Sequence, residues 1–480
     1  MKQFGRAAAI CLLGLLRALP AGATCGGGGG GGRGGMSPTG DVAERVYQVP
    51  WTVISPTDTP PDHGLVLYWF PSTVEEVKKS SLRSSRDLSL YAAQCVAMEI
   101  ADSSQTFGRK LDVGKVPAAV LTDGAGKVLG RVEGEAGFLK APDVEKLLRD
   151  ELKKREDGLN QRLNDARLKA KAGDRPGAIE TFKAVFDEAC LFPKKAKDAS
   201  KELKKLGVEV QEQSTDSSSL AEPTFEGQKA EEVVLVMEKG LAAELAGRYP
   251  EAEDLYSRAR ALDPGDPTPP RYLGELYRHH TGEWAKARLV FDEILRRPAD
   301  PLTRSVALHG LGKMTIHQGD FAKGLQLLEA SVGAFPLPLA YRNLAVYWNS
   351  EGDPIKTAAY VKKALELDPE DAYNRVFAAV FLAAAGHKDE ALRIAEENVS
   401  LLPASYNLAA IYAQAGDRER ALELLRRHFY EYERYRAVRS EEMMEARVDA
   451  VFASLQTDPE FLSLTALADG QLAMPRMTAH

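Results

Sequence analysis

Cysteine is scarce in this 480-residue chain, which contains four: Cys11, Cys25, Cys95 and Cys190. None belongs to a C-x-x-C pair, and no His/Cys group has zinc-ligand spacing, which argues against a dithiol active site and a zinc site. We expect Cys95 and Cys190 to be buried free thiols.

The sequence also has no excess of basic residues. It contains 62 Lys and Arg and 69 Asp and Glu, which gives a net charge of −7. General nucleic-acid binders carry a basic excess, so we expect no nucleic-acid partner.

Motifs for nucleotide or metal chemistry are absent as well. The sequence contains neither G-x-x-x-x-G-K-[ST] nor H-E-x-x-H. The glycine-rich run at 26–35 precedes every predicted strand, whereas a phosphate loop follows a strand. His279 and His280 form an isolated pair, which is more often a surface feature than a metal site. These absences predict a protein that is not an enzyme and that carries no cofactor or metal.

The N-terminal residues 1–23 have the pattern of a secretory signal peptide. A basic start (MKQFGR) precedes an apolar run at 7–16, and Ala21-Gly22-Ala23 matches a small-x-small cleavage site. The apolar run is too short to span a bilayer, and no other segment of the sequence is long and apolar enough. We therefore expect an exported protein, either periplasmic or attached to the envelope.

Two other interpretations of the N-terminus stay open. Cys25 is followed by seven glycines, which resembles a lipoprotein acylation site with a flexible tether and would give the chain a lipid anchor. Alternatively, Met36 is the true start, and the protein is then cytoplasmic. Residues 24–50 are expected to form a glycine-rich tether and lead-in without packed structure.

Residues 51–155 alternate between apolar runs and polar stretches, which is typical of an α/β domain. Strands are predicted at 64–70 (GLVLYWF), 96–101, 118–122 and 128–132, the last two as a hairpin around an Asp-Gly turn. Helices are predicted at 73–94 and at 143–154.

This order of strands and helices resembles the thioredoxin fold. Val116-Pro117 stands where that family carries a cis-proline before its third core strand. The resemblance implies a thioredoxin-like domain over residues 51–155. However, thioredoxins place C-x-x-C after the first core strand, and here the residues after that strand read PSTVE. Thiol–disulfide exchange needs a thiolate at that point, so we expect the domain to be redox-inactive.

A repeat of about 34 residues fills the second half of the chain. Glycines recur at Gly247, Gly282, Gly319, Gly352, Gly386 and Gly416, and prolines mark the unit ends at Pro264, Pro298, Pro336, Pro369 and Pro403. Each glycine is expected to end the first helix of a pair, where a left-handed backbone is easiest for glycine. Proline cannot continue a helix, so the pattern predicts six separate helix pairs.

These units resemble the tetratricopeptide repeat (TPR). The resemblance implies an all-α solenoid over residues 231–429, a right-handed superhelix of helix pairs. A weaker single match at 156–207 predicts a TPR-like helical segment, joined to the array by a polar linker at 208–230. We expect capping helices at 430–465 and a disordered tail at 466–480.

In tetratricopeptide repeats the first helix of each pair lines a concave groove, so the resemblance implies which side chains face it. They are Arg271, Glu275 and Arg278 in the second unit, His309, Lys313 and His317 in the third, Arg342 and Asn349 in the fourth, and Val376 and Val380 in the fifth. A basic middle followed by an apolar stretch suits an acidic or C-terminal peptide with an apolar anchor. The alternative is that these residues form ordinary solvated helix faces.

Together these observations predict a non-catalytic interaction protein that docks a partner protein or peptide through the array. An alternative is a thiol-redox or chaperone accessory protein that acts through the thioredoxin-like domain and uses Cys95. A third is a structural assembly factor whose solenoid oligomerises.

Overall fold

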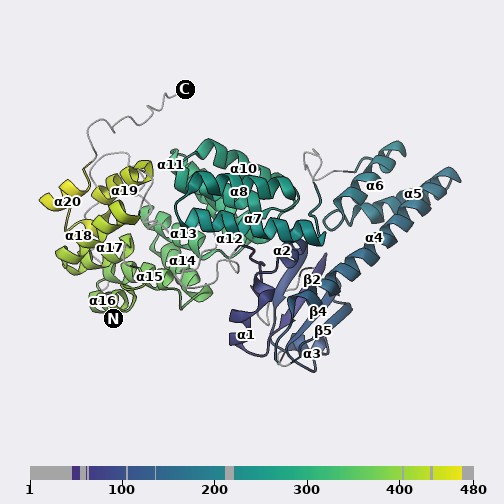
Figure 1. Cartoon of the computed structure of the whole chain (residues 1–480), viewed down its shortest axis with the longest axis horizontal. Helices are drawn as coiled ribbons and strands as arrows, with labels where there is room; N and C mark the ends of the chain where they lie inside the picture. Colours follow the sequence, from purple (N-terminus) through teal and green to yellow (C-terminus); the bar gives the residue numbers. More distant parts are fainter. Residues whose placement is uncertain are drawn as a thin grey trace, which may run out of the picture.

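The computed structural model describes residues 46–54, 61, 64–103, 106–135, 137–210, 221–402, 405–432 and 436–466. The predicted signal peptide, Cys11, the lipidation candidate Cys25, the alternative start Met36 and the tail after residue 466 lie outside these residues. Among the described residues, no helix combines the length and the apolar character that a membrane crossing needs. Figure 1 shows a small sheet at one side of a long array of helices.

A five-stranded mixed sheet forms the first part of the fold. Its strands are β1 (Thr52–Val53), β2 (Leu65–Phe70), β3 (Val96–Ile100), β4 (Ala118–Asp123) and β5 (Val128–Glu133), in the order β1-β3-β2-β4-β5. β1 and β2 run parallel to β3, whereas β4 pairs antiparallel with β2 and with β5. Every residue of β2 is buried, as its unbroken apolar sequence predicts for a central strand covered on both faces. The Val116–Pro117 peptide bond before β4 is cis, as the resemblance implies.

The long helix predicted at 73–94 is interrupted. It divides into α1 (Val74–Lys79), a 3-10 turn (Ser81–Arg83) and α2 (Arg86–Ala93). Ser80 and Ser85 cause the division, because each accepts a backbone N–H with its hydroxyl and so begins a new helical segment. A further short helix, α3 (Thr106–Lys110), lies between β3 and β4.

One continuous helix, α4 (Ala141–Lys171), replaces the two helical segments that the sequence predicts on either side of residue 155. Its buried apolar residues, including Leu148, Leu152, Leu159 and Leu163, keep a helical period across that point, so nothing ends the helix there. The first half packs on the sheet, and the second half packs on α5 (Arg175–Phe186) and α6 (Pro193–Lys205). Figure 1 shows α4 running from beside the sheet outward to α5. The predicted domain boundary therefore falls inside a helix.

Six consecutive helix pairs form the array. They are α7 (Gly227–Leu245) with α8 (Tyr249–Leu262), α9 (Thr268–Glu275) with α10 (Trp284–Arg296), α11 (Pro301–His317) with α12 (Phe321–Ala334), α13 (Pro338–Ser350) with α14 (Pro354–Leu367), α15 (Ala372–Ala384) with α16 (Lys388–Asn398), and α17 (Tyr406–Ala415) with α18 (Arg418–Arg427). A π-helical turn, η3 (Leu276–Thr281), extends α9, and η4 (His428–Tyr432), also π-helical, follows α18. Beyond these, α19 (Arg436–Val448), a 3-10 turn (Ala450–Phe452) and α20 (Pro459–Leu464) cover the apolar end of the stack.

Glycine makes this packing possible in two ways. The six turn glycines named above all have positive φ angles, between 67° and 95°, as predicted. Inside the helices, glycine lets neighbouring backbones approach closely. A Cβ on Gly274 would lie 2.3 Å from the Phe291 ring, and one on Gly312 would lie 3.0 Å from the carbonyl oxygen of Gly324.

Gly274→Ala therefore tests the close approach of α9 and α10. Because the added methyl group would overlap the Phe291 ring, we expect a lower urea midpoint, equivalent to a loss of about 1–3 kcal/mol in the free energy of unfolding. Gly333→Ala in α12 is the matched control, since a methyl group there meets no atom within 4 Å. Alanine favours a helix over glycine, so the control should be neutral or stabilising. Equal midpoints for the two variants would contradict the packing described.

Candidate functional site

The side chains predicted to face the groove lie on the first helices of their pairs. Arg271 and Glu275 belong to α9, Arg278 to the turn that extends it, His309, Lys313 and His317 to α11, Arg342 and Asn349 to α13, and Val376 and Val380 to α15. Their positions along the array thus agree with the sequence analysis. Their surroundings differ from it.

The charges of the second unit are paired within the array. Arg278 donates to both carboxylate oxygens of Glu275, with Nε–Oε1 and Nη2–Oε2 distances of 3.0 and 2.8 Å. Glu275 is only 5% exposed. Arg271 is equally buried and donates to Thr303 Oγ1, in the third unit, at 3.3 Å. The Arg278–Glu275 pair is formed within one unit, and the Arg271–Thr303 contact joins the second unit to the third.

His309 and Lys313 are buried beside this pair, at 1% and 6% exposure. Asn343 Nδ2 lies 2.6 Å from His309 Nε2, and a neutral imidazole can accept this hydrogen bond. Burial, reinforced by the charge of Arg278, lowers the pKa of His309 to about 3, so the ring is neutral at physiological pH. Lys313 Nζ lies 5.5 Å from the centre of the Tyr347 ring, within range of a cation–π contact.

The more accessible of the predicted groove residues are Arg342, Asn349 and His317. Arg342 is half-buried, donates to Asn374 Oδ1 of the fifth unit and lies 5.9 Å from the centre of the Tyr373 ring. Asn349 is exposed near the end of α13. His317 is half-buried, with its ring centre 5.8 Å from that of Trp284.

These placements correct the expected character of the groove. Four of the predicted polar residues are more than nine-tenths buried: Arg271, Glu275, His309 and Lys313. They form neither an open basic surface nor an ordinary solvated face. Val376 and Val380 belong to the apolar core of the last two units, so they are not free anchors for a ligand. Whether any of the predicted residues binds a peptide stays a prediction.

Part of this burial comes from a segment that the sequence analysis assigned to the unpacked lead-in. Residues 46–50, which we call the strap, are packed. Val46 is fully buried, and its carbonyl oxygen accepts a hydrogen bond from Arg271 Nη2 at 3.4 Å. Tyr47 packs in the core of the first units, and its hydroxyl donates to Asp266 Oδ2 at 2.9 Å. Val49 packs into the sheet core, so the strap passes from the array to the sheet.

A buried ionic cluster, which we call the lock, joins the sheet to the array beside the strap. Arg86, at the start of α2, donates to Asp263 and Asp266, which flank the Pro-Gly pair after α8. The three residues are 6%, 0% and 1% exposed. Arg86 Nη1 also donates to the Thr224 carbonyl oxygen at 2.9 Å. Burial, opposed by the charge of Arg86, raises the pKa of Asp266.

The predicted linker at 208–230 is also partly packed. Thr224 donates its backbone N–H to Asp263 Oδ2 at 2.8 Å, and the Phe225 ring stacks on Tyr91 of α2 with centres 4.7 Å apart. α7 begins at Gly227, so residues 221–226 form an ordered bridge from the lock to the array. Phe225 is the one aromatic residue of this polar stretch, and it was the available sign that part of the stretch is packed. The polar composition of the rest led to the prediction of a linker.

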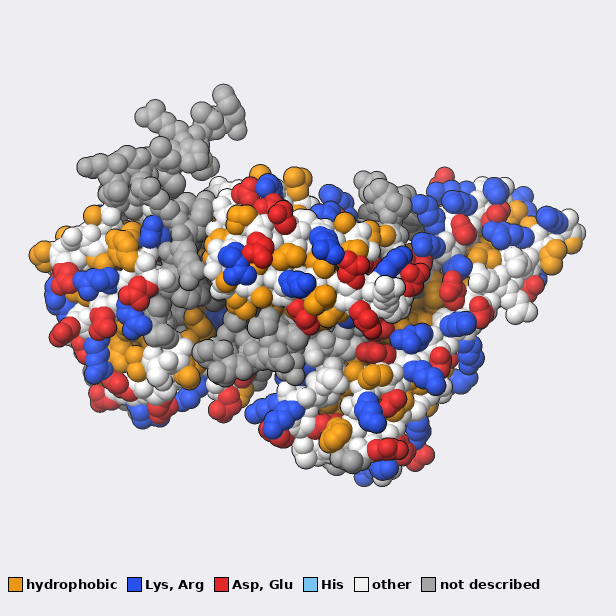
Figure 2. Space-filling model, in the orientation of Figure 1, with side chains coloured by type: hydrophobic (Ala, Val, Ile, Leu, Met, Phe, Trp, Pro, Cys, Tyr) orange, Lys and Arg blue, Asp and Glu red, His pale blue; other side chains and the backbone are white. Residues whose placement is uncertain are grey.

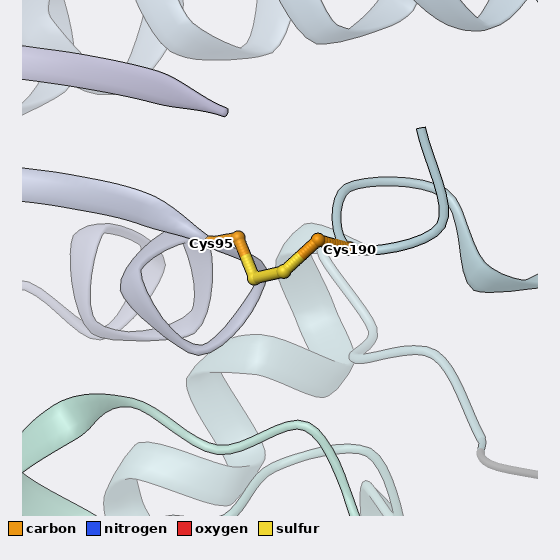
Figure 3. Close-up of a disulfide and its surroundings, with 2 residues drawn as sticks. All are labelled: Cys95 and Cys190. Atoms are coloured by element: carbon orange, nitrogen blue, oxygen red, sulfur yellow. A yellow bond between two sulfur atoms is a disulfide. The ribbon is translucent and has the colours of Figure 1, made fainter. Parts of the chain in front are cut away.

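A disulfide joins Cys95 to Cys190, with the Cα atoms 5.8 Å apart (Figure 3). The expectation of two buried free thiols is therefore wrong. Cys95 precedes β3, and Cys190 lies in the turn 187–192 between α5 and α6, which the packing of α5 along α4 brings back to the sheet. Leu191 of this turn is 5% exposed and packs in the sheet core. The available signal was the pair of cysteines in a chain expected to be exported.

The outer surface carries no charge of one sign over a large area of the face shown. Figure 2 shows acidic and basic side chains interspersed along the array on that face. Many are paired across neighbouring helices, for example Arg260 with Glu293 at 2.5 Å and Arg375 with Glu397 at 2.5 Å. Among the described residues, no group of three or more His, Cys, Asp or Glu could hold a metal ion.

Comparison with known proteins identifies the repeats. One tetratricopeptide-repeat profile matches residues 231–267, and a second matches 375–397 and 402–427. The photosystem I assembly protein Ycf3 of Rippkaea orientalis is 30% identical over 105 residues, which are 19% of this chain and 61% of that protein. The chain thus spans less than two thirds of the length of this relative. The predicted tetratricopeptide repeats are confirmed as the helical solenoid of the C-terminal part.

The lock predicts a strong effect of one buried cation. Arg86→Met would leave Asp263 and Asp266 buried without their cationic partner, so we expect a loss of about 3–5 kcal/mol in unfolding free energy. Arg149→Met is the matched control, because Arg149 pairs with Asp87 at 3.1 Å but is 53% exposed. An exposed pair contributes at most about 1 kcal/mol. Urea unfolding at pH 7 measures both, and similar losses in the two variants would show that the lock is unimportant.

Proposed function

We propose that this protein is a non-catalytic interaction scaffold whose repeat array holds a partner protein or peptide. The observation that supports the proposal most directly is the array itself, six contiguous helix pairs with tetratricopeptide-repeat matches at both ends. Stacked repeats of this kind create extended surfaces on which partners bind. The name of the relative, a photosystem I assembly protein, describes a role in building a protein complex. Of that role, we propose for this chain only that it binds a partner protein.

The partner site we propose lies beyond the strap. The strap contacts the inner helix of the second unit, where Arg271 is already engaged by Val46 and by Thr303 of the third unit. The inner helix of the fourth unit carries exposed Asn349 and half-buried Arg342. We propose that an acidic or C-terminal peptide lies along this part of the array, with its carboxylates near Arg342.

We further propose that the sheet is a thioredoxin-like domain without redox catalysis. Support comes from the strand order, with two parallel and two antiparallel pairings, and from the cis bond before β4. The residue positions that follow β2 carry no cysteine. Instead, Ser72 donates its N–H and hydroxyl to Glu76 Oε2, at 2.7 and 2.8 Å, and Thr73 caps α1. A carboxylate and two hydroxyls at this helix start supply no thiolate.

We propose that the protein is exported. Export predicts that the signal peptide is removed and that the disulfide is formed. The disulfide supports it, because such bonds persist outside the reducing cytosol. We expect intact-mass spectrometry of the chain from its host to show loss of residues 1–23. We also expect Cys95 and Cys190 to resist alkylation until a reductant is added. A chain that begins at Met36 with both thiols alkylated directly would favour the cytoplasm, whereas an acyl group on Cys25 would indicate a lipid anchor.

Photo-cross-linking tests the proposed partner site. With p-benzoylphenylalanine replacing Asn349 in the full-length chain, we expect a covalent adduct with the partner in the native host. Arg342→Glu in the same chain should reduce the adduct about tenfold, since one lost charged hydrogen bond is worth roughly 1.5–3 kcal/mol.

The matched control places the cross-linker at Lys362 of the outer helix α14, which is 77% exposed and should give no adduct. Cys95→Ser should leave the Asn349 adduct unchanged, whereas a thiol-redox accessory protein would lose its partner with this substitution. Equal adducts from Asn349 and Lys362, or none from either, would contradict the proposed site. Adducts between two copies of this chain would favour the oligomerising assembly factor.

A further inference from the structure

The two cysteines of the disulfide differ in their exposure to solvent. Cys190 is exposed, whereas Cys95 is half-buried at the start of β3. Cys190 also lines a cavity of about 260 Å³ between α2, α4, the turn 187–192 and the bridge to the array. The aromatic rings of Tyr91, Phe192 and Phe225 form part of its wall. A reagent that enters this cavity therefore meets Cys190.

Basic side chains outnumber acidic ones in the lining of the cavity. Four cationic side chains contribute to it, and only two acidic ones: Arg149, Lys153, Lys195 and Arg297, against Glu156 and Glu222. Three of these cations are paired with carboxylates: Lys195 with Glu156 at 3.2 Å, Arg149 with Asp87 at 3.1 Å and Arg297 with Glu293 at 2.9 Å. Nearby cations stabilise a thiolate over a thiol, so they assist both an incoming thiolate and a departing one.

The disulfide also holds a structural joint. The turn 187–192 is tied to the sheet by this bond and by the apolar contacts of Leu191 and Phe192 in the sheet core. The same cavity is lined by Pro223 of the bridge and by Gly265 beside the lock. The sheet, the α4–α6 helices and the array therefore meet around one disulfide.

We propose that Cys95–Cys190 is an exchangeable disulfide, with Cys190 as the sulfur that a protein dithiol attacks. The thiolate of the dithiol forms a bond to Cys190 Sγ, and the Cys190–Cys95 bond breaks. Cys95 leaves as a thiolate and takes a proton from solvent. The second thiol of the partner then attacks the mixed disulfide and releases Cys190. The partner is oxidised to its disulfide, and this chain gains two electrons and two protons.

Exchange at this position loosens the joint and leaves the fold in place. Leu191 and Phe192 keep their apolar contacts in the reduced chain, so the turn stays near the sheet. It is then free to open locally, which exposes its backbone amides. The proposal does not depend on the partner site of the array, and it can fail or succeed independently of it.

The test uses the full-length chain with Cys11 and Cys25 changed to Ser, so that only the two cysteines of interest remain. The oxidised protein is treated with dithiothreitol, without denaturant, and thiols are counted by a maleimide–polyethylene-glycol gel shift. We expect both thiols to become labelled within minutes. Labelling that requires urea would overturn the proposal, since a buried structural disulfide behaves in that way.

Single variants then identify the attacked sulfur. In Cys95→Ser the remaining Cys190 should react with an aromatic disulfide reagent at least about tenfold faster than Cys95 does in Cys190→Ser, because exposure controls thiol reactivity. Thermal unfolding of each variant checks that both are folded. Equal rates, or a faster Cys95, would exclude Cys190 as the entry point.

Hydrogen exchange measures the joint. On reduction we expect at least about fivefold faster amide exchange in residues 187–192, with α17 unchanged as the internal control. The double variant with serine at both positions should behave like the reduced chain. Unchanged exchange in 187–192 would show that the bond does not control the joint.

Discussion

A buried guanidinium lies at the centre of the contact between the sheet and the array. Arg86 comes from a short helix of the sheet, and its two carboxylate partners come from the turn that ends the first repeat pair. Charges that are almost completely buried are tolerated only when they are paired and hydrogen-bonded. The lock therefore demands that sheet, bridge and first repeats meet in one arrangement. The strap, the stacked Phe225 and the start of α7 all lie around it and follow from it.

The buried charges on the inner face of the array must be paired in the same way. A groove lined by charges looks like a binding surface in the sequence, but here Arg278 and Glu275 neutralise each other, and Arg271 is used by the strap. His309 is neutral because water does not reach it. These charged groups are therefore engaged within the array. The more accessible polar groups, Arg342 and Asn349, lie on the fourth unit, which is why we propose the partner site there.

Local features were predicted well from the sequence, and contacts between distant residues were not. The repeat period, the six turn glycines and the buried strand β2 depend on neighbouring residues, and the structure agrees with each. The disulfide, the lock and the strap join residues 95 to more than 200 positions apart. Residues 46–50 and 221–226 contain apolar or aromatic residues, but they have no periodic pattern that would identify a packed segment. Whether these segments are packed depends on the sheet and the repeat helices that lie beside them in the folded chain.

The separation of the lock residues also sets an order of events during synthesis. Arg86 precedes its partner Asp266 by 180 residues. At about 5–20 residues per second, roughly 9–36 s pass between the two leaving the ribosome. The sheet and α4 are complete well before that interval ends. A nascent chain therefore carries Arg86 without its carboxylates, and any factor that protects the emerging sheet meets a cation there that the finished protein hides.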